Sequence, residues 1–138
     1  MNRKTRDLLI AAWFLVSLCL PGPMAQAQTT HLDPEAIAAA SGAKATTTPD
    51  GVVRIAWARS DVPVKVDKMP LKPFAGLGSW AAFSAAPHGA MVMGDTVVFQ
   101  DEVTPAMDAA FASGLEVSGL HNHFFFDEPK VYLMHIGG

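Results

Sequence analysis

Three of the five histidines in the sequence, His121, His123 and His135, lie close together near its C-terminal end. The two-residue spacing of His121 and His123 places both side chains on the same face of a β-strand. Imidazole nitrogens suit Zn, Cu, Fe and Ni ions. The sequence therefore predicts a site for a divalent transition metal, with zinc as the first choice, and an open fourth position there would favour activation of water.

Three acidic residues are candidates to complete this metal site: Asp95, Glu102 and Glu128. Asp95 shares one face of an expected strand with Met91 and Met93, whose soft sulfur atoms would favour copper if they line the site. Glu102 also suits a helix N-terminus, where the helix dipole favours negative charge. Glu128 lies in an expected turn, where a solvated role competes with metal binding.

The three-histidine site depends on the register of two expected strands. If residues 127–129 form a three-residue turn, His121 lies opposite His135 and His123 lies opposite Leu133. Directly opposed residues have Cβ atoms about 4.5–5.5 Å apart, so two imidazoles could share one ion. A slip of one residue would turn His135 to the other face. The alternative is that these histidines are half-buried and bond only to the backbone.

The surrounding pattern predicts the elements that hold these residues. Asp33 and Pro34 are typical of a helix start, and Gly42 of its end. An apolar stripe that begins at Val103 predicts a second helix, whose start can be capped by Asp101 or Thr104. Strands are expected at 43–47, 52–59, 62–66, 79–85, 90–99, 115–126 and 131–136. Together they predict a single small α+β domain, with two helices on one face of a mostly antiparallel sheet.

The N-terminal residues predict export from the cytoplasm. Basic residues are followed by an apolar run from Leu8 to Leu20 and by Ala25-Gln26-Ala27, the order of a secretory signal peptide. We expect cleavage near Ala27, a mature chain of residues 28–138, and a periplasmic or secreted location. The only cysteine, Cys19, lies in the signal segment, so neither disulfides nor cysteine ligands are expected after cleavage.

Composition narrows the classes of partner. The net charge is −3 and no basic run occurs, so nucleic-acid binding is not expected. The apolar run is shorter than the roughly 20 residues of a membrane-spanning helix, so no stable span is expected after cleavage. A small molecule or a component of the cell envelope remains as a partner class.

Several segments resemble the LppY/LpqO family of exported bacterial proteins, whose function is unknown. The matching segments are Ala58-Arg59-Ser60-Asp61, Gly76-Leu77-Gly78-Ser79-Trp80, Met93-Gly94-Asp95, Asp101-Glu102-Val103-Thr104-Pro105, Leu120-His121-Asn122-His123, Glu128-Pro129-Lys130-Val131 and Met134-His135-Ile136. The resemblance implies that the histidine and acidic positions belong to the family pattern. Relatives usually continue past this point, often into a second repeat. The early end suggests a truncated domain whose C-terminal strand pairs with a second copy or a second repeat.

These observations favour an exported metal-binding domain. If the protein is an enzyme, a metal-activated water attacking an ester, amide or glycan is the natural chemistry. One alternative is a non-catalytic ligand-binding module of the envelope, in which Trp57, Trp80 and the glycine-rich loop 76–78 matter more. The other is a metal carrier without catalysis, for which the methionines favour copper.

Overall fold

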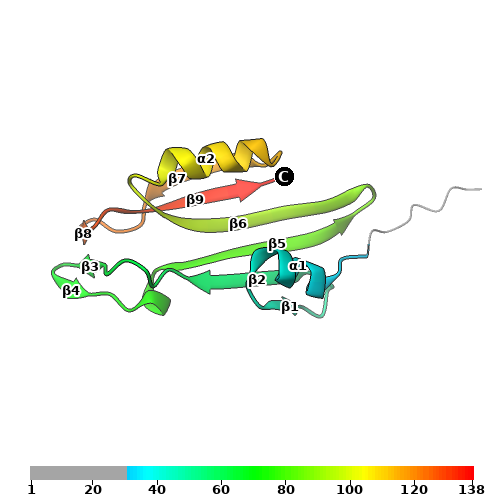
Figure 1. The fold of residues 1–138 in the computed structure, drawn as a ribbon, viewed down its shortest axis with the longest axis horizontal. Helices are drawn as coiled ribbons and strands as arrows, with labels where there is room; N and C mark the ends of the chain where they lie inside the picture. Colours follow the sequence, from blue (N-terminus) through cyan, green and yellow to red (C-terminus); the bar gives the residue numbers. More distant parts are fainter. Residues whose placement is uncertain (1–30) are drawn as a thin grey trace, which may run out of the picture.

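A computed structural model describes residues 31–138, so the expected signal peptide lies outside the described residues. The main element is a six-stranded antiparallel sheet with the strand order β1-β2-β5-β6-β9-β7 (Figure 1). Its strands are β1 (Ala45–Thr47), β2 (Val53–Ala58), β5 (Gly78–Ala86), β6 (Gly89–Phe99), β7 (Glu116–Asn122) and β9 (Val131–Gly137). The α+β class and the antiparallel sheet predicted from the sequence are confirmed.

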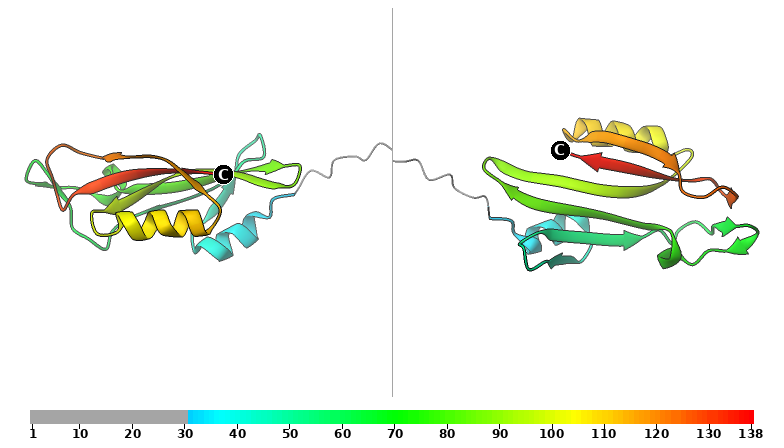
Figure 2. Two further views of the ribbon diagram at one scale, coloured as in Figure 1. Left: turned by 90° about the horizontal axis from the view of Figure 1, so that it is seen from above. Right: turned by 180° about the vertical axis from the view of Figure 1, so that it is seen from behind.

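Both predicted helices are present, α1 (Pro34–Ser41) and α2 (Val103–Ala112). The Asp33 carboxylate caps α1 by accepting hydrogen bonds from the first free N–H groups, and Gly42 ends the helix with a left-handed φ of 69°. Figure 2 shows both helices on the same side of the sheet. The opposite face therefore carries no helix from the described residues.

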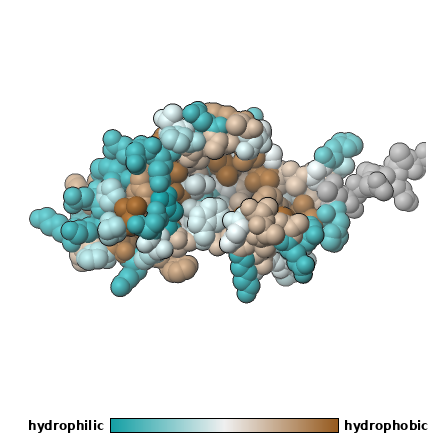
Figure 3. All heavy atoms as spheres, viewed as in Figure 1, coloured by the Kyte–Doolittle hydropathy of each residue, from teal (hydrophilic) through white to brown (hydrophobic). Residues whose placement is uncertain are grey.

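Buried side chains on the helix-bearing face form one part of the core. They come from four adjacent strands and are Val53, Ile55, Ala81, Val98 and Met134. Figure 3 views this face and shows apolar residues in the hollow between the two helices. Burial of these apolar side chains contributes to the folding free energy and packs the helices against the sheet.

A second, three-stranded sheet lies at one end of the molecule (Figure 1). It has the order β4-β3-β8 and contains β3 (Lys65–Val66), β4 (Met69–Pro70) and β8 (Asp127–Glu128), with the short 3-10 helix η1 (Pro73–Ala75) beside it. A second core cluster lies there, formed by Val64, Leu77, Val97, Phe99 and Val131. The strand expected at 62–66 is thus only two residues long, and residues 127–129 form no tight turn between neighbouring strands.

The C-terminal strand β9 is an interior strand of the large sheet. It pairs with β6 on one side and β7 on the other, and Gly138 exchanges two backbone hydrogen bonds with Val92. The prediction that this strand offers a free edge to a second copy or repeat is therefore wrong, because both of its edges are already paired. Within residues 31–138, no helix is long and apolar enough to cross a membrane.

Candidate metal centre

The structure brings His121 and His135 into direct contact on the face without helices. Their Nε2 atoms are 3.0 Å apart and their ring centroids 5.0 Å apart. The predicted register is wrong by two residues, since His121 lies opposite Leu133 and Gly119 lies opposite His135. A two-residue shift keeps every side chain on its face, so the two histidines still meet, along a diagonal.

The hydrogen bonds of the two rings assign where their protons lie. The Nδ1–H of His135 donates to the Asp95 carboxylate. The Nδ1–H of His121 donates to the backbone carbonyl of Asn122 at 3.0 Å, and that oxygen can only accept. In the neutral imidazole the other nitrogen then carries a lone pair. With both rings neutral, two Nε2 lone pairs face one another, an arrangement that a metal ion between them or a proton on one ring would stabilise.

Asp95 holds the His135 ring and is itself held by Trp80. The indole Nε1–H of Trp80 donates to Asp95 Oδ2 at 3.0 Å, while the other carboxylate oxygen accepts from His135. The residues Trp80, Asp95 and His135 lie directly opposite one another on β5, β6 and β9. The site is thus a hydrogen-bonded row of side chains across four adjacent strands, which we call the polar row: Trp80, Asp95, His135 and His121.

Gly119 leaves the space in which the His135 ring lies. A Cβ atom built on Gly119 would be 2.8 Å from Cδ2 of His135, well inside ordinary contact. Glycine in a strand often marks such a close approach. A β-bulge between Val117 and Gly119 also shifts the register at this point and turns Val117 towards the helix-bearing face. Neither Trp80 nor Gly119 was predicted from the sequence as a member of the metal site.

His123 lies outside this pair. It follows the last residue of β7, its backbone N–H donates to the carbonyl of Val131, and its ring packs against Phe124 with centroids 4.2 Å apart. Across residues 31–138, no group of three or more His, Cys, Asp or Glu side chains gathers closely enough to hold a metal ion. The structure therefore reduces the predicted three-histidine site to two imidazoles.

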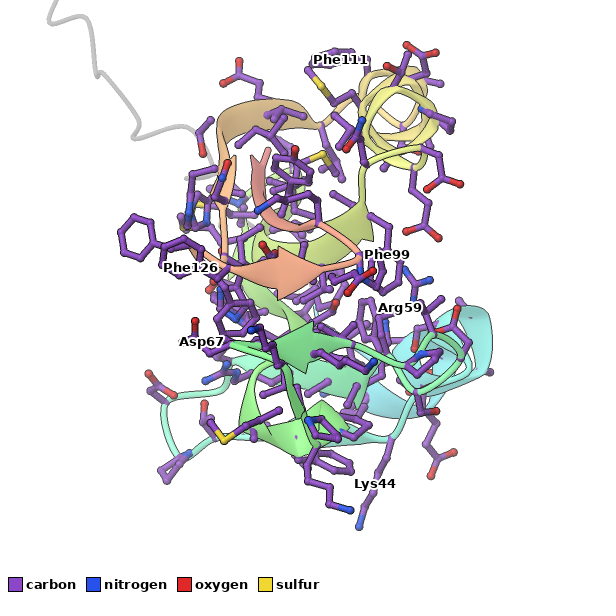
Figure 4. All side chains as sticks on the ribbon, turned by 90° about the vertical axis from the view of Figure 1, so that its left-hand side faces the viewer. Lys44, Arg59, Asp67, Phe99, Phe111 and Phe126 are labelled. Carbon is purple, nitrogen blue, oxygen red and sulfur yellow. The ribbon has the colours of Figure 1, made fainter. Side chains whose placement is uncertain are left out.

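Glu102 belongs to an ion-pair network at the start of α2, in which both of its carboxylate oxygens already accept hydrogen bonds. The Arg59 guanidinium donates to both of its carboxylate oxygens, at 2.7 and 2.9 Å, and also to both oxygens of Asp61. Glu102 further accepts from the N–H of Phe99, whose ring lies 4.7 Å from Arg59 (Figure 4). Neither Asp101 nor Thr104 caps α2 as predicted, since Glu102 occupies the N-cap position.

These contacts shift the pKa values of Arg59, Asp61 and Glu102 so that the charged form of each side chain is favoured. Hydrogen bonds from Arg59 lower the pKa of Glu102 and lower the pKa of Asp61 to about 2. Hydrogen bonds to Asp61 and then Glu102 raise the pKa of Arg59. The network therefore remains charged at neutral pH and joins the end of β2 to the start of α2. Two of the family-like segments, around Arg59 and Glu102, thus have a structural role here.

Glu128 is also separated from the histidine pair. It lies on β8, opposite Lys65 of β3, and is exposed. Its neighbour Asp127 is the structural residue, because its carboxylate accepts from the N–H of Val131 at 2.7 Å and from Lys130 at 2.8 Å. Burial raises the pKa of Asp127, but the bonds from Lys130 and Val131 outweigh it, so the pKa is lowered.

The fold and site define a class of protein: an α+β domain whose antiparallel sheet carries a carboxylate–histidine–histidine row on the face opposite its helices. The chain belongs to a family, because residues 35–138 match the family model described as Domain of Unknown Function (DUF1259). This confirms membership of a family of unknown function, while the LppY/LpqO name stays a prediction. No curated protein and no solved structure matches the chain.

Proposed function

We propose that this protein is an exported domain that binds a divalent transition-metal ion between Nε2 of His121 and Nε2 of His135. The observation that carries the proposal is that the Nε2 atoms of the two rings face one another, 3.0 Å apart, while each Nδ1 is hydrogen-bonded to an oxygen. Two nitrogens that each lie about 2.0–2.1 Å from a tetrahedral zinc ion are roughly 3.3–3.4 Å apart. The pair would need to open by only a few tenths of an ångström.

The contacts behind the pair support the same proposal. Histidine ligands of metals usually donate their second ring N–H to a carboxylate or a backbone carbonyl, which fixes the tautomer and raises the basicity of the ligand. His135 donates in this way to Asp95, and His121 donates to the carbonyl of Asn122. Zinc remains the first choice. Met91 and Met93 share this face and are about half exposed, so copper is the second metal to test.

With two protein ligands, further coordination positions stay open to water or to a bound molecule. That arrangement suits metal-assisted hydrolysis, in which the metal lowers the pKa of a bound water, and we propose this reaction class for the first substrate screens. The His135 side chain is 38% exposed, so a substrate could reach the pair from solvent. A carrier of copper would use the same two ligands without a reaction.

The test is the metal content of residues 28–138, purified without a histidine tag and reconstituted with Zn, Cu, Fe or Ni before dialysis. About one retained ion per chain is expected in the wild type and in His88→Ala, a control that removes an exposed histidine from a turn. Loss of that ion is expected in His121→Ala and in His135→Ala. Retention in His135→Ala but loss in His123→Ala would overturn the assignment of ligands.

A nitrogen-15 NMR spectrum of the imidazoles separates the metal from its competitor, a shared proton. The metal-free protein should show both rings protonated at Nδ1, and the addition of one equivalent of zinc should shift both Nε2 signals together. If no metal shifts these signals while the protein stays folded, the facing lone pairs share a proton instead, and the metal proposal is refuted.

A further inference from the structure

A groove runs along the helix-free face beside the polar row. It has a volume of about 390 Å³, within the range of small-molecule sites, and opens between the β1–β2 turn and strands β2, β5 and β6. Its walls are mainly apolar, and one of its lining residues, Trp80, is also a member of the polar row. The lining residues are Thr48, Asp50, Val52, Arg54, Trp80, Ala82, Ser84, Met91 and Met93.

Arg54 gives this groove a positive group that no described residue neutralises. Its guanidinium lies over the Trp80 ring, 4.7 Å from the centroid, and makes no ion pair with any residue in 31–138. Arg59 is the contrast, because both of its edges are occupied by carboxylates. A guanidinium over an indole ring can still present its N–H groups to a ligand, and these match a carboxylate in a bidentate manner.

The remaining walls suit an apolar body. Met91 and Met93 are 52% and 56% exposed. In the sheet, Ala82 lies between Met93 and Arg54, and Ser84 lies opposite Met91. Methionine side chains are flexible and polarisable, so they adapt to apolar molecules of different shape. Exposure of two methionines beside a tryptophan on one face is costly in water, and a bound apolar group would remove that cost.

Asp50 sets the polarity of the groove. It lies at the β1–β2 turn, where its carboxylate accepts a hydrogen bond from the Thr48 hydroxyl, and this bond lowers the pKa of Asp50. The turn end of the groove is therefore negative, while the end at Arg54 and Trp80 is positive. An anionic head group would lie at Arg54, away from the turn and towards the polar row.

We infer that this groove binds an organic anion with an apolar body, the anionic group on Arg54 and the body along Trp80, Met91 and Met93. The inference deepens the proposed function, because Trp80 also hydrogen-bonds to Asp95 and the bound molecule would lie against the Trp80 end of the polar row. Binding of the anion does not require the metal, however. The two ideas can therefore fail separately.

The test compares three probes that share one apolar body and differ only in charge: octanoate, octanol and octylammonium. Each is titrated into the full chain without its signal segment, in a chelating buffer that removes metal, and binding is followed by the indole N–H signal of Trp80 and by the methionine methyl signals. We expect octanoate to bind about tenfold or more tightly than octanol, since a charge-assisted hydrogen bond is added, and octylammonium to bind most weakly.

Two variants and two matched controls locate the site. Arg54→Gln should weaken octanoate about tenfold or more and leave octanol unchanged, while Met93→Gln should weaken both. Lys44→Gln removes an exposed cation that points away from the molecule (Figure 4), and Met69→Gln removes an exposed methionine on β4. Neither control should change binding.

Three outcomes would overturn the inference. The first is equal binding of octanoate and octanol, and the second is preference for octylammonium that is lost in Asp50→Asn. The third is unchanged octanoate binding in Arg54→Gln. Selective octanoate binding in a chain that holds no metal would sustain this inference while the proposed metal function fails. Metal binding without octanoate binding would show the reverse.

Discussion

Gly119→Ala provides the sharpest test of the histidine pair, because it adds one methyl group at the point where the His135 ring lies. The new Cβ would be 2.8 Å from Cδ2 of His135, whereas ordinary contact begins at 3.4 Å, so the ring must move by about 0.6 Å. The backbone of Gly119 does not have the positive φ that strains other residues. The atom it meets belongs to a side chain on the protein surface, so the fold should survive.

The displacement is large compared with what a metal site tolerates. Ligand distances in such sites agree to within about 0.2 Å, and disturbance of the groups that orient a ligand costs about 10–100-fold in affinity, or roughly 1.4–2.8 kcal/mol. We expect that loss in zinc affinity, measured by competition with a chelator of known affinity. The melting temperature should change little.

Gly78→Ala is the matched control, since it makes the same change in strand β5 and its new Cβ would meet no atom within 4 Å. Its zinc affinity should equal that of the wild type. If Gly119→Ala also binds zinc like the wild type, His135 is not held as the structure indicates, or it is not a ligand. If both variants lose affinity equally, the effect comes from the sheet and not from the ring.

Three further predictions concern the support of the pair and the stability of the fold. Asp95→Asn removes the carboxylate that holds the Nδ1–H of His135, so zinc affinity should fall about 10–100-fold in the same competition assay; an unchanged affinity would mean that Asp95 orients nothing. Trp80→Phe keeps an aromatic ring and removes the indole hydrogen bond to Asp95, so its loss of zinc affinity should be smaller than that of Asp95→Asn; a larger loss would contradict the proposed role of Trp80 as a support of Asp95. Acid should destabilise the protein through Glu102 and Asp127, whose pKa values are lowered in the folded state. Because these carboxyls bind protons less readily when folded, their stabilisation is complete above the ordinary values of 4.5 and 3.8 and is lost as the pH falls below them. Denaturant unfolding at pH 7 and pH 3 should show this loss, and Glu102→Gln should show less of it than the wild type.

The elements of the fold were predictable because their signals are local. Asp33, Pro34 and Gly42 define α1 by capping chemistry alone, and the apolar stripe beginning at Val103 defines α2. The strands followed from apolar runs between turn residues. The small sheet was not predictable, because its strands are only two residues long and β8 joins β3 from more than 60 positions away in the chain, at Val66 and Asp127.

The candidate site was predictable in part for a related reason. Alternation along a strand indicated that His121 and His123 share a face. His135 and Asp95 were candidates by residue type, and their place on the same face depends on strand pairing. Glu102 lies at the start of α2, one of its two predicted roles. Its ion pair with Arg59 was not predictable, because the two residues are distant in sequence. The role of Trp80 depends on the pairing of β5 with β6, which no local pattern specifies.

His121 and His135 meet in the structure although the turn between their strands was predicted wrongly, and the size of the register shift explains why. The Asp127 carboxylate accepts hydrogen bonds from the N–H of Val131 and from the Lys130 ammonium group. Residues 127–128 pair with β3 instead of forming a turn after β7. The connection between β7 and β9 is therefore longer than three residues, and the pairing shifts by two. A register shift by an odd number of residues would have turned His135 to the helix-bearing face, whereas a shift by an even number keeps it on the helix-free face. Direct opposition would also have left no glycine beneath the ring. The observed register instead places Gly119 opposite His135, and this small residue lets the imidazole lie flat across β7 and reach His121. The two rings therefore meet along a diagonal in the observed register, and Gly119 opposite His135 leaves the space for that contact.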